Sequence, residues 1–94
     1  MAFARVVTFD GVDQARIDGL KQQIEAGDPP EGVPATEFLL LHDPGAGQAV
    51  AVMFFDTEDD YRQADEVMNA MPAGDTPGNR TSVQKYEVAT RVSV

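Results

Sequence analysis

The sequence lacks cysteine and tryptophan, and it is short of basic residues, with 7 Lys and Arg against 16 Asp and Glu. Without cysteine, the chain can form no disulfide, thiolate nucleophile, or cysteine-ligated metal or iron–sulfur site. The formal net charge of −9 would repel both a phosphate backbone and an anionic membrane surface. We therefore expect neither a nucleic acid nor a membrane as a partner.

The N-terminal residues also lack the basic segment, long apolar run and cleavage site that an export signal would have. The expected location is therefore the cytoplasm. The length of 94 residues predicts one domain, 1–94, near the smallest size that folds on a hydrophobic core alone.

What the chain does contain is an apolar stretch from Gln48 to Phe55. Its β-branched and aromatic residues favour a strand over a buried helix, and it is too short to span a membrane. Both of its alternating sets of side chains are apolar, so this strand would have no water-facing side. A small protein must therefore cover both faces of the sheet at this strand.

Three more strands are predicted: 3–10 and 36–42 are apolar on both faces, and 80–94 has one mostly apolar and one mostly polar face. The segment 43–47 holds Pro and Gly and predicts a hairpin connection to the strand at 48–55. The last strand differs from the others, because one of its two faces is mostly polar and suits the edge of a sheet.

Two helices are predicted between these strands. The first follows the N-cap residue Asp13 and stops at Gly27. The second follows Thr57 and ends before Pro72. Its buried stripe is expected to consist of Tyr61, Ala64, Met68 and Met71.

The resulting order, β-α-β-β-α-β, predicts an α+β fold of the ferredoxin-like type with a four-stranded antiparallel sheet. Right-handed crossovers place the strands 3–10 and 48–55 in the centre. Two helices cover only one face of such a sheet, and the other would expose more apolar surface than monomers usually do. We therefore predict a homodimer in which two sheets close face to face into an α+β barrel.

Four segments carry a resemblance to a known family: 4–13, 39–43, 54–60 and 83–88. In these segments the chain resembles small actinobacterial members of the antibiotic biosynthesis monooxygenase-like family, within the dimeric α+β-barrel superfamily. The resemblance implies the same fold and dimer as the patterning. It also implies a pocket between sheet and helices, where an aromatic polyketide-like substrate is deprotonated and its carbanion reacts with dioxygen. Other superfamily members degrade haem or act as isomerases or decarboxylases.

Such an oxygenase site needs an apolar cavity and polar groups that orient a phenol or enol and stabilise an oxyanion. Tyr61 and Tyr86 are the candidate hydrogen-bond donors, Arg80 the candidate for stabilising negative charge, and Asn69 a further polar candidate. The expected substrate pocket is lined by Phe54, Phe55 and Met68. The structural alternative leaves both tyrosines in the core or at an interface and Asn69 in solvent.

Two residues stand apart from this scheme. His42, the single histidine, ends a predicted strand and is expected to be exposed or bonded within the turn. Haem or metal binding through it is a third alternative, weakened because the second helix has no histidine and the chain no tryptophan. Arg5 lies alone on an apolar strand and is predicted to pair with an acid such as Glu87, or else to line the dimer cavity.

Acidic residues gather at 56–60, where the partial positive charge of a helix N-terminus explains them without a metal. No metal site and no cofactor is predicted. Two functions stay open. One is cofactor-independent oxidation of a small hydrophobic aromatic substrate. The other is a non-catalytic homodimer, structural or binding a small hydrophobic ligand, whose cavity is filled by its own side chains, chiefly the methionines.

Overall fold

The computed structural model describes residues 2–26, 32–70 and 78–93, and it confirms the predicted order of elements. The elements are β1 (Phe3–Asp10), α1 (Gln14–Glu25), β2 (Glu37–Asp43), β3 (Gln48–Phe55), α2 (Glu58–Asn69) and β4 (Asn79–Glu87). The predicted helix stop at Gly27, and Met71 with Pro72, lie outside the described residues.

The four strands form one antiparallel sheet in the order β2-β3-β1-β4, so the two most apolar strands lie in its centre as predicted. Phe3 at the start of β1 lies opposite Phe55 of β3 and Glu87 of β4. The predicted ferredoxin-like α+β fold is thus confirmed.

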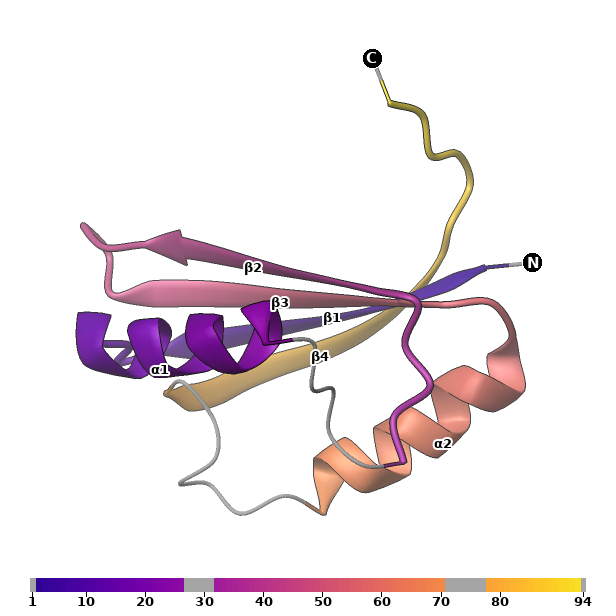
Figure 1. Ribbon diagram of the computed structural model, residues 1–94, viewed down its shortest axis with the longest axis horizontal. Coiled ribbons are helices and arrows are strands. Elements are labelled where there is room, and N and C mark those ends of the chain that lie inside the picture. Colours follow the sequence, from indigo (N-terminus) through magenta and orange to yellow (C-terminus); the bar gives the residue numbers. More distant parts are fainter. Residues whose placement is uncertain (1, 27–31, 71–77, 94) are drawn as a thin grey trace.

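The predicted extension of the last strand to residue 94 is wrong, because β4 ends at Glu87. β1 begins at Phe3, so little of it is left to pair with the chain beyond Glu87. One further bond, from the Val88 amide to the Ala2 carbonyl at 2.9 Å, closes the ladder. The chain then leaves the sheet on the side opposite the helices (Figure 1).

Both predicted helix starts are confirmed by their caps. The Asp13 carboxylate accepts a hydrogen bond from the Arg16 amide at 2.8 Å, and the Thr57 hydroxyl accepts one from the Asp60 amide at 3.1 Å. Each bond satisfies an amide that the first helical turn leaves without a partner. The first turn of α2 is acidic, as suits the positive end of a helix dipole.

Both helices cover the same face of the sheet, with α1 over the β2 side and α2 over the β4 side (Figure 1). This helix face holds the core. Under α1 the buried residues are Val7, Phe9, Val12, Ile17, Ala49 and Ala51. Towards α2 they are Val33, Met53, Phe55, Tyr61 and Ala64.

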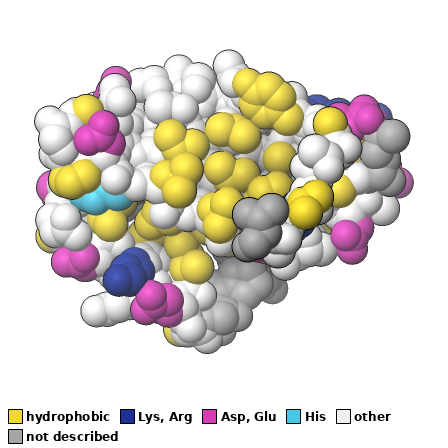
Figure 2. All heavy atoms as spheres, turned by 90° about the horizontal axis from the view of Figure 1, so that it is seen from above, with side chains coloured by type: hydrophobic (Ala, Val, Ile, Leu, Met, Phe, Trp, Pro, Cys, Tyr) yellow, Lys and Arg dark blue, Asp and Glu magenta, His cyan; other side chains and the backbone are white. Residues whose placement is uncertain are grey.

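The other face of the sheet, called here the open face, has no helix over it. Figure 2 shows hydrophobic side chains gathered across the middle of this face. Leu39 and Leu41 of β2 are 42% and 55% exposed, and Tyr86 of β4 is 51% exposed. Their half-buried neighbours from the two central strands are Val6, Val50, Val52 and Phe54.

A close backbone approach fixes the entry to β4. A Cβ atom on Gly78 would lie 2.3 Å from the backbone oxygen of Asp10, so no other residue fits there without a backbone shift. This contact locates the start of β4 against the end of β1. It thereby sets the position of Arg80, two residues further on.

Candidate functional site

A buried guanidinium group stands on the central strand β1. The side chain of Arg5 is only 2% exposed and points to the helix face. Its Nε donates to the Asp65 carboxylate at 2.9 Å, and its Nη2 donates to the Asn69 Oδ1 at 3.2 Å. Asp65 and Asn69 lie one turn apart on α2, so a single face of the helix supplies both partners.

The prediction that Arg5 pairs with an acid is confirmed, but the choice of Glu87 was wrong. Glu87 lies opposite Phe3, whereas the residue opposite Arg5 on β4 is Lys85. The acid comes from α2 instead, because Arg5 faces the helices. The same orientation keeps Arg5 away from the open face, so it does not line the space between two stacked sheets.

Asn69 also joins Arg5 to a second arginine. Arg80 Nη1 donates to the same Asn69 Oδ1 at 2.9 Å. A register shift between Thr8 and Phe9 sets Arg80 opposite Phe9 on β1. We call Arg5, Asp65, Asn69 and Arg80 the arginine cluster. It carries two positive charges and one negative charge in a chain whose net charge is −9.

Tyr61 lies one turn before Asp65 on α2 and is 6% exposed. Its ring meets that of Phe55 edge to face, with 5.7 Å between the ring centres. Burial raises the pKa of the Tyr61 phenol and the negative charge of Asp65 raises it further, while Arg5 lowers it. The phenol is therefore protonated at neutral pH and can donate a hydrogen bond.

An ammonium group lies over the same aromatic residues. Lys85 Nζ is 5.2 Å from the centre of the Tyr61 ring and 5.1 Å from that of Phe3. It also lies 3.4 Å from the Glu58 carboxylate. The hydrogen bond and charge of Lys85, followed by the charge of Arg62, lower the pKa of Glu58.

The structure brings two of the four candidate catalytic residues, Asn69 and Arg80, into contact, and it places Tyr61 two turns earlier on the same side of α2, against Phe55. The fourth, Tyr86, lies on the open face, where its hydroxyl donates to the Gln84 side chain. The three expected pocket residues also separate. Phe54 lies on the open face, Phe55 is fully buried against Tyr61, and Met68 packs half-buried at the edge of the same core.

Sequence reasoning named Asn69 and Arg80 but missed Asp65 as the acid that holds Arg5. The available signal was the spacing of Tyr61, Asp65 and Asn69, each four residues after the last. That spacing puts a carboxylate and a carboxamide on the stripe that faces the sheet. A lone arginine on the strand beneath them is the matching cation.

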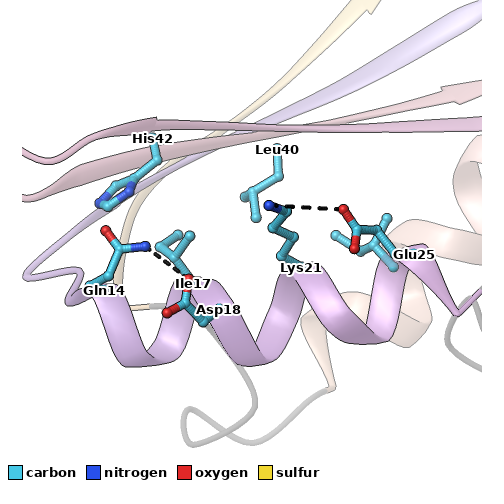
Figure 3. A pocket seen from close by; sticks show the side chains of 8 residues that line it. Gln14, Ile17, Asp18, Lys21, Glu25, Leu40 and His42 are labelled. Atoms are coloured by element: carbon cyan, nitrogen blue, oxygen red, sulfur yellow. Dashed lines mark hydrogen bonds and ion pairs between the residues drawn. The ribbon is translucent and has the colours of Figure 1, made fainter.

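A separate groove opens between α1 and β2, with a volume of about 400 Å³. In Figure 3 the side chains of α1 rise toward those of β2, with Ile17 and Leu40 in the middle. The groove is lined by Gln14, Ile17, Asp18, Lys21, Ile24, Glu25, Leu40 and His42. His42 is half-buried and faces α1, so it is neither fully exposed nor, within the described residues, bonded to the turn.

Among residues 2–26, 32–70 and 78–93, no three His, Asp or Glu side chains gather closely enough to hold a metal ion. No helix within these ranges is long and apolar enough to cross a membrane.

The chain matches no protein-family model and no curated protein sequence. Solved structures do match it over almost its whole length. A protein from Chloroflexus aurantiacus J-10-fl, assigned as an antibiotic biosynthesis monooxygenase, has a TM-score of 0.64 at 10% identity, with 99% of this chain and 98% of that chain covered. Rv0793 from Mycobacterium tuberculosis has a TM-score of 0.59 at 11% identity, with 99% and 100% covered.

A third similar structure is a mutant of MhuD with two manganese protoporphyrin IX molecules bound per active site. Its TM-score is 0.61 at 13% identity, over 98% of this chain and 99% of that one. At such identities the likeness establishes a shared fold and no residue roles. The monooxygenase-like fold implied by the resemblance of the sequence is therefore confirmed.

Proposed function

We propose that the protein is a homodimer that binds a small aromatic anion at the arginine cluster and promotes its oxidation by dioxygen without a cofactor. The observation that carries this proposal is the convergence of Arg5 and Arg80 on the single oxygen Asn69 Oδ1. Two guanidinium groups held beside a single carboxylate, Asp65, give the cluster a net positive charge and favour an anionic ligand there. Phenolates and enolates are small aromatic anions of this kind.

The chemistry follows from the charge that develops on the substrate. An anthrone passes a proton from carbon to water, and the negative charge left on the carbon spreads to its oxygen. Arg80 is exposed and can contact that oxygen, while buried Arg5 holds Asn69 and adds fixed positive charge. Tyr61, protonated but packed against Phe55 and two helical turns from Asn69, belongs to the supporting core and not to the substrate contacts. The carbanion then reacts with dioxygen, and anthrone plus dioxygen gives anthraquinone plus water.

The homodimer is part of the proposal because the open face carries Leu39, Leu41 and Tyr86 in water in a single chain. A second copy placed sheet to sheet would bury these side chains on both subunits. The cytoplasm stays the predicted location.

A second candidate is a non-catalytic homodimer that binds a ligand at the same cluster. The observation in its favour is that the space between the sheet and α2 is occupied by the protein's own side chains. Phe55 and Ala64 are 0% exposed, Met53 is 3% exposed and Tyr61 is 6% exposed. An aromatic ligand would therefore lie over Asn69 and Arg80 at the surface and not deep beneath α2.

The residues present do not fit a porphyrin. Haem iron needs an axial His, Cys or Tyr ligand, with Met serving only beside a His, and the chain has no Cys. α2 has no histidine, and the single histidine, His42, faces the groove beside α1, away from the arginine cluster. Tyr61 is packed against Phe55 and Tyr86 lies on the other face of the sheet.

The test is oxygen uptake with a panel of anthrones and quinols, for the wild type and Arg80→Gln. Loss of one oxyanion donor lowers turnover by about 10²–10³-fold in enzymes that stabilise an oxyanion, and we expect a fall of at least about 10²-fold. Arg62→Gln is the matched control, since Arg62 is an exposed arginine of α2 that pairs with Glu58 and not with the cluster.

A hydroxyanthraquinone, titrated by absorbance, separates the two candidates. If the panel gives no uptake but this probe binds and Arg80→Gln weakens its binding, the cluster is a ligand site without chemistry. Uptake that Arg80→Gln leaves intact would refute the role given to the cluster. If the panel gives no uptake and the probe does not bind, both candidates are refuted.

A further inference from the structure

The groove between α1 and β2 has the size and lining of a ligand site, and it is distinct from the arginine cluster. Its volume of about 400 Å³ lies within the range of small-molecule pockets. Ile17, which is 6% exposed, and half-buried Leu40 and Ile24 give it an apolar surface. A planar hydrocarbon body can lie on these side chains.

The two ends of the groove differ in charge. At one end lie His42, Gln14 and Asp18, and the Gln14 amide donates to the Asp18 carboxylate at 2.9 Å (Figure 3). At the other end Lys21 lies 4.0 Å from Glu25, with both side chains 64% exposed. The charges of Lys21 and Glu25 cancel, whereas the carboxylate charge of Asp18 at the first end is not compensated.

The first end also has capacity to accept hydrogen bonds. Within the described part of the chain, the imidazole of His42 makes no hydrogen bond and no ion pair, although it is half-buried. A ring nitrogen of His42, the carboxamide oxygen of Gln14 and the carboxylate of Asp18 are all acceptors. An ammonium group carries three N–H donors and would be attracted to all three.

We propose that this groove binds an aromatic amine, with its ring on Ile17 and Leu40 and its ammonium group at Asp18. The charges fix the orientation, because Glu25 at the opposite end is already paired with Lys21, whereas Asp18 has only the uncharged Gln14 amide as a partner. The net charge of −9 favours a cationic ligand over an anionic one as well. The ligand proposed for this groove is thus a cation, whereas the ligand proposed for the arginine cluster is an anion.

The probe is tryptamine, followed through the backbone amide shifts of the ¹⁵N-labelled protein. Saturable shifts are expected in α1 from Gln14 to Glu25 and in β2 from Leu40 to His42. Indole-3-acetate has the same ring and a carboxylate in place of the ammonium group, and it should bind at least about tenfold more weakly, since an anion meets Asp18 instead of a matching charge.

Two variants should move the affinity in opposite directions. Asp18→Asn should weaken tryptamine binding about threefold to fivefold by removing the attracting carboxylate, and Lys21→Gln should strengthen it about twofold by leaving the carboxylate of Glu25 without its cation. Asp59→Asn makes the same change of charge on α2, where the side chain is 92% exposed, and should leave the affinity unchanged.

The proposal is overturned by tryptamine shifts that do not saturate or that lie outside α1 and β2. It is equally overturned if indole-3-acetate binds as tightly as tryptamine, or if Asp18→Asn and Asp59→Asn have the same effect. Because the groove and the arginine cluster share no residue, failure of this test leaves the oxygen-uptake result unaffected.

Discussion

The two faces of the sheet are built from the same alternating strands and meet different surroundings. On the helix face Phe55 is 0% exposed and Met53 is 3% exposed. On the open face Leu41 is 55% exposed and Leu39 is 42% exposed, although both are as hydrophobic as the buried residues. Two short helices can cover only one face of the sheet. The difference in exposure between the faces therefore comes from the helix cover and not from the composition of the strands.

The faces differ in their polar groups as well. The helix face holds a buried guanidinium group, Arg5, whose charge is met by Asp65 and Asn69 from α2. On the open face the nearest counterpart is Arg91, which pairs with Glu37 and lies 4.4 Å from the centre of the Phe54 ring. The helix face thus keeps its charge buried and fixed, as a site requires, while the open face is apolar at its centre, as an interface requires.

The largest expected effect is on the stability of the helix face. Phe55→Ala removes a fully buried ring and its edge-to-face contact with Tyr61, and should lower the free energy of unfolding by about 3–5 kcal/mol. Urea denaturation followed by circular dichroism measures this loss.

The matched change on the open face is Leu41→Ala. In dilute protein, where single chains predominate, it should cost less than about 1 kcal/mol because the side chain is half exposed already. At high concentration the cost should grow if the face is covered by a second copy. Equal costs for Phe55→Ala and Leu41→Ala in dilute protein would remove the distinction between the faces.

The next largest effect is on association. Leu41→Glu would place a carboxylate in the apolar centre of the proposed interface. Because that interface is two-fold symmetric, each dimer would contain two such carboxylates. We expect the dissociation constant of the dimer to rise at least about 100-fold, equal to about 2.7 kcal/mol, by sedimentation equilibrium.

Gln22→Glu is the control for added charge, because Gln22 is an exposed residue of α1, on the helix side of the sheet. It should leave association unchanged. A wild-type protein that sediments as a monomer at micromolar concentration would contradict the dimer outright. So would a Leu41→Glu variant that associates as tightly as the wild type.

Much of the fold could be predicted from the sequence, because it depends on patterns within each segment. The short apolar runs at 3–10 and 48–55 and the capping residues Asp13 and Thr57 correctly marked two strands and two helix starts. The end of β4 could not be predicted in this way. It depends on where β1 begins on the neighbouring strand, and 80–94 has strand-like composition throughout.

The candidate site was only partly predictable for the same reason. The polar groups that an oxygenase site requires singled out Asn69 and Arg80 as candidates. The sequence does not indicate which strand residue lies beneath which turn of a helix, so Arg5 was assigned to Glu87 and Asp65 was overlooked. Tyr86 and Phe54 were included because side chains on the two faces of a sheet cannot be told apart when both faces are apolar.

The smallest expected effect concerns the edge of the helix face, where Lys85 links Glu58 to the rings of Phe3 and Tyr61. The pKa of Glu58 is lower in the folded protein than its ordinary value near 4.3. Its ionised form therefore stabilises the fold above that value, and the contribution is lost as the pH falls through the lower, folded pKa. The wild type should be slightly more stable than Glu58→Gln at pH 7, and the difference should shrink as the pH falls below the ordinary value and vanish beneath the lower, folded pKa, as measured by urea midpoints across this range. Glu66→Gln, which removes an exposed α2 carboxylate with no ion pair among the described residues, should show no such convergence. If the stability difference between the wild type and Glu58→Gln persisted at low pH, the stabilisation would not come from the ion pair between the Glu58 carboxylate and Lys85.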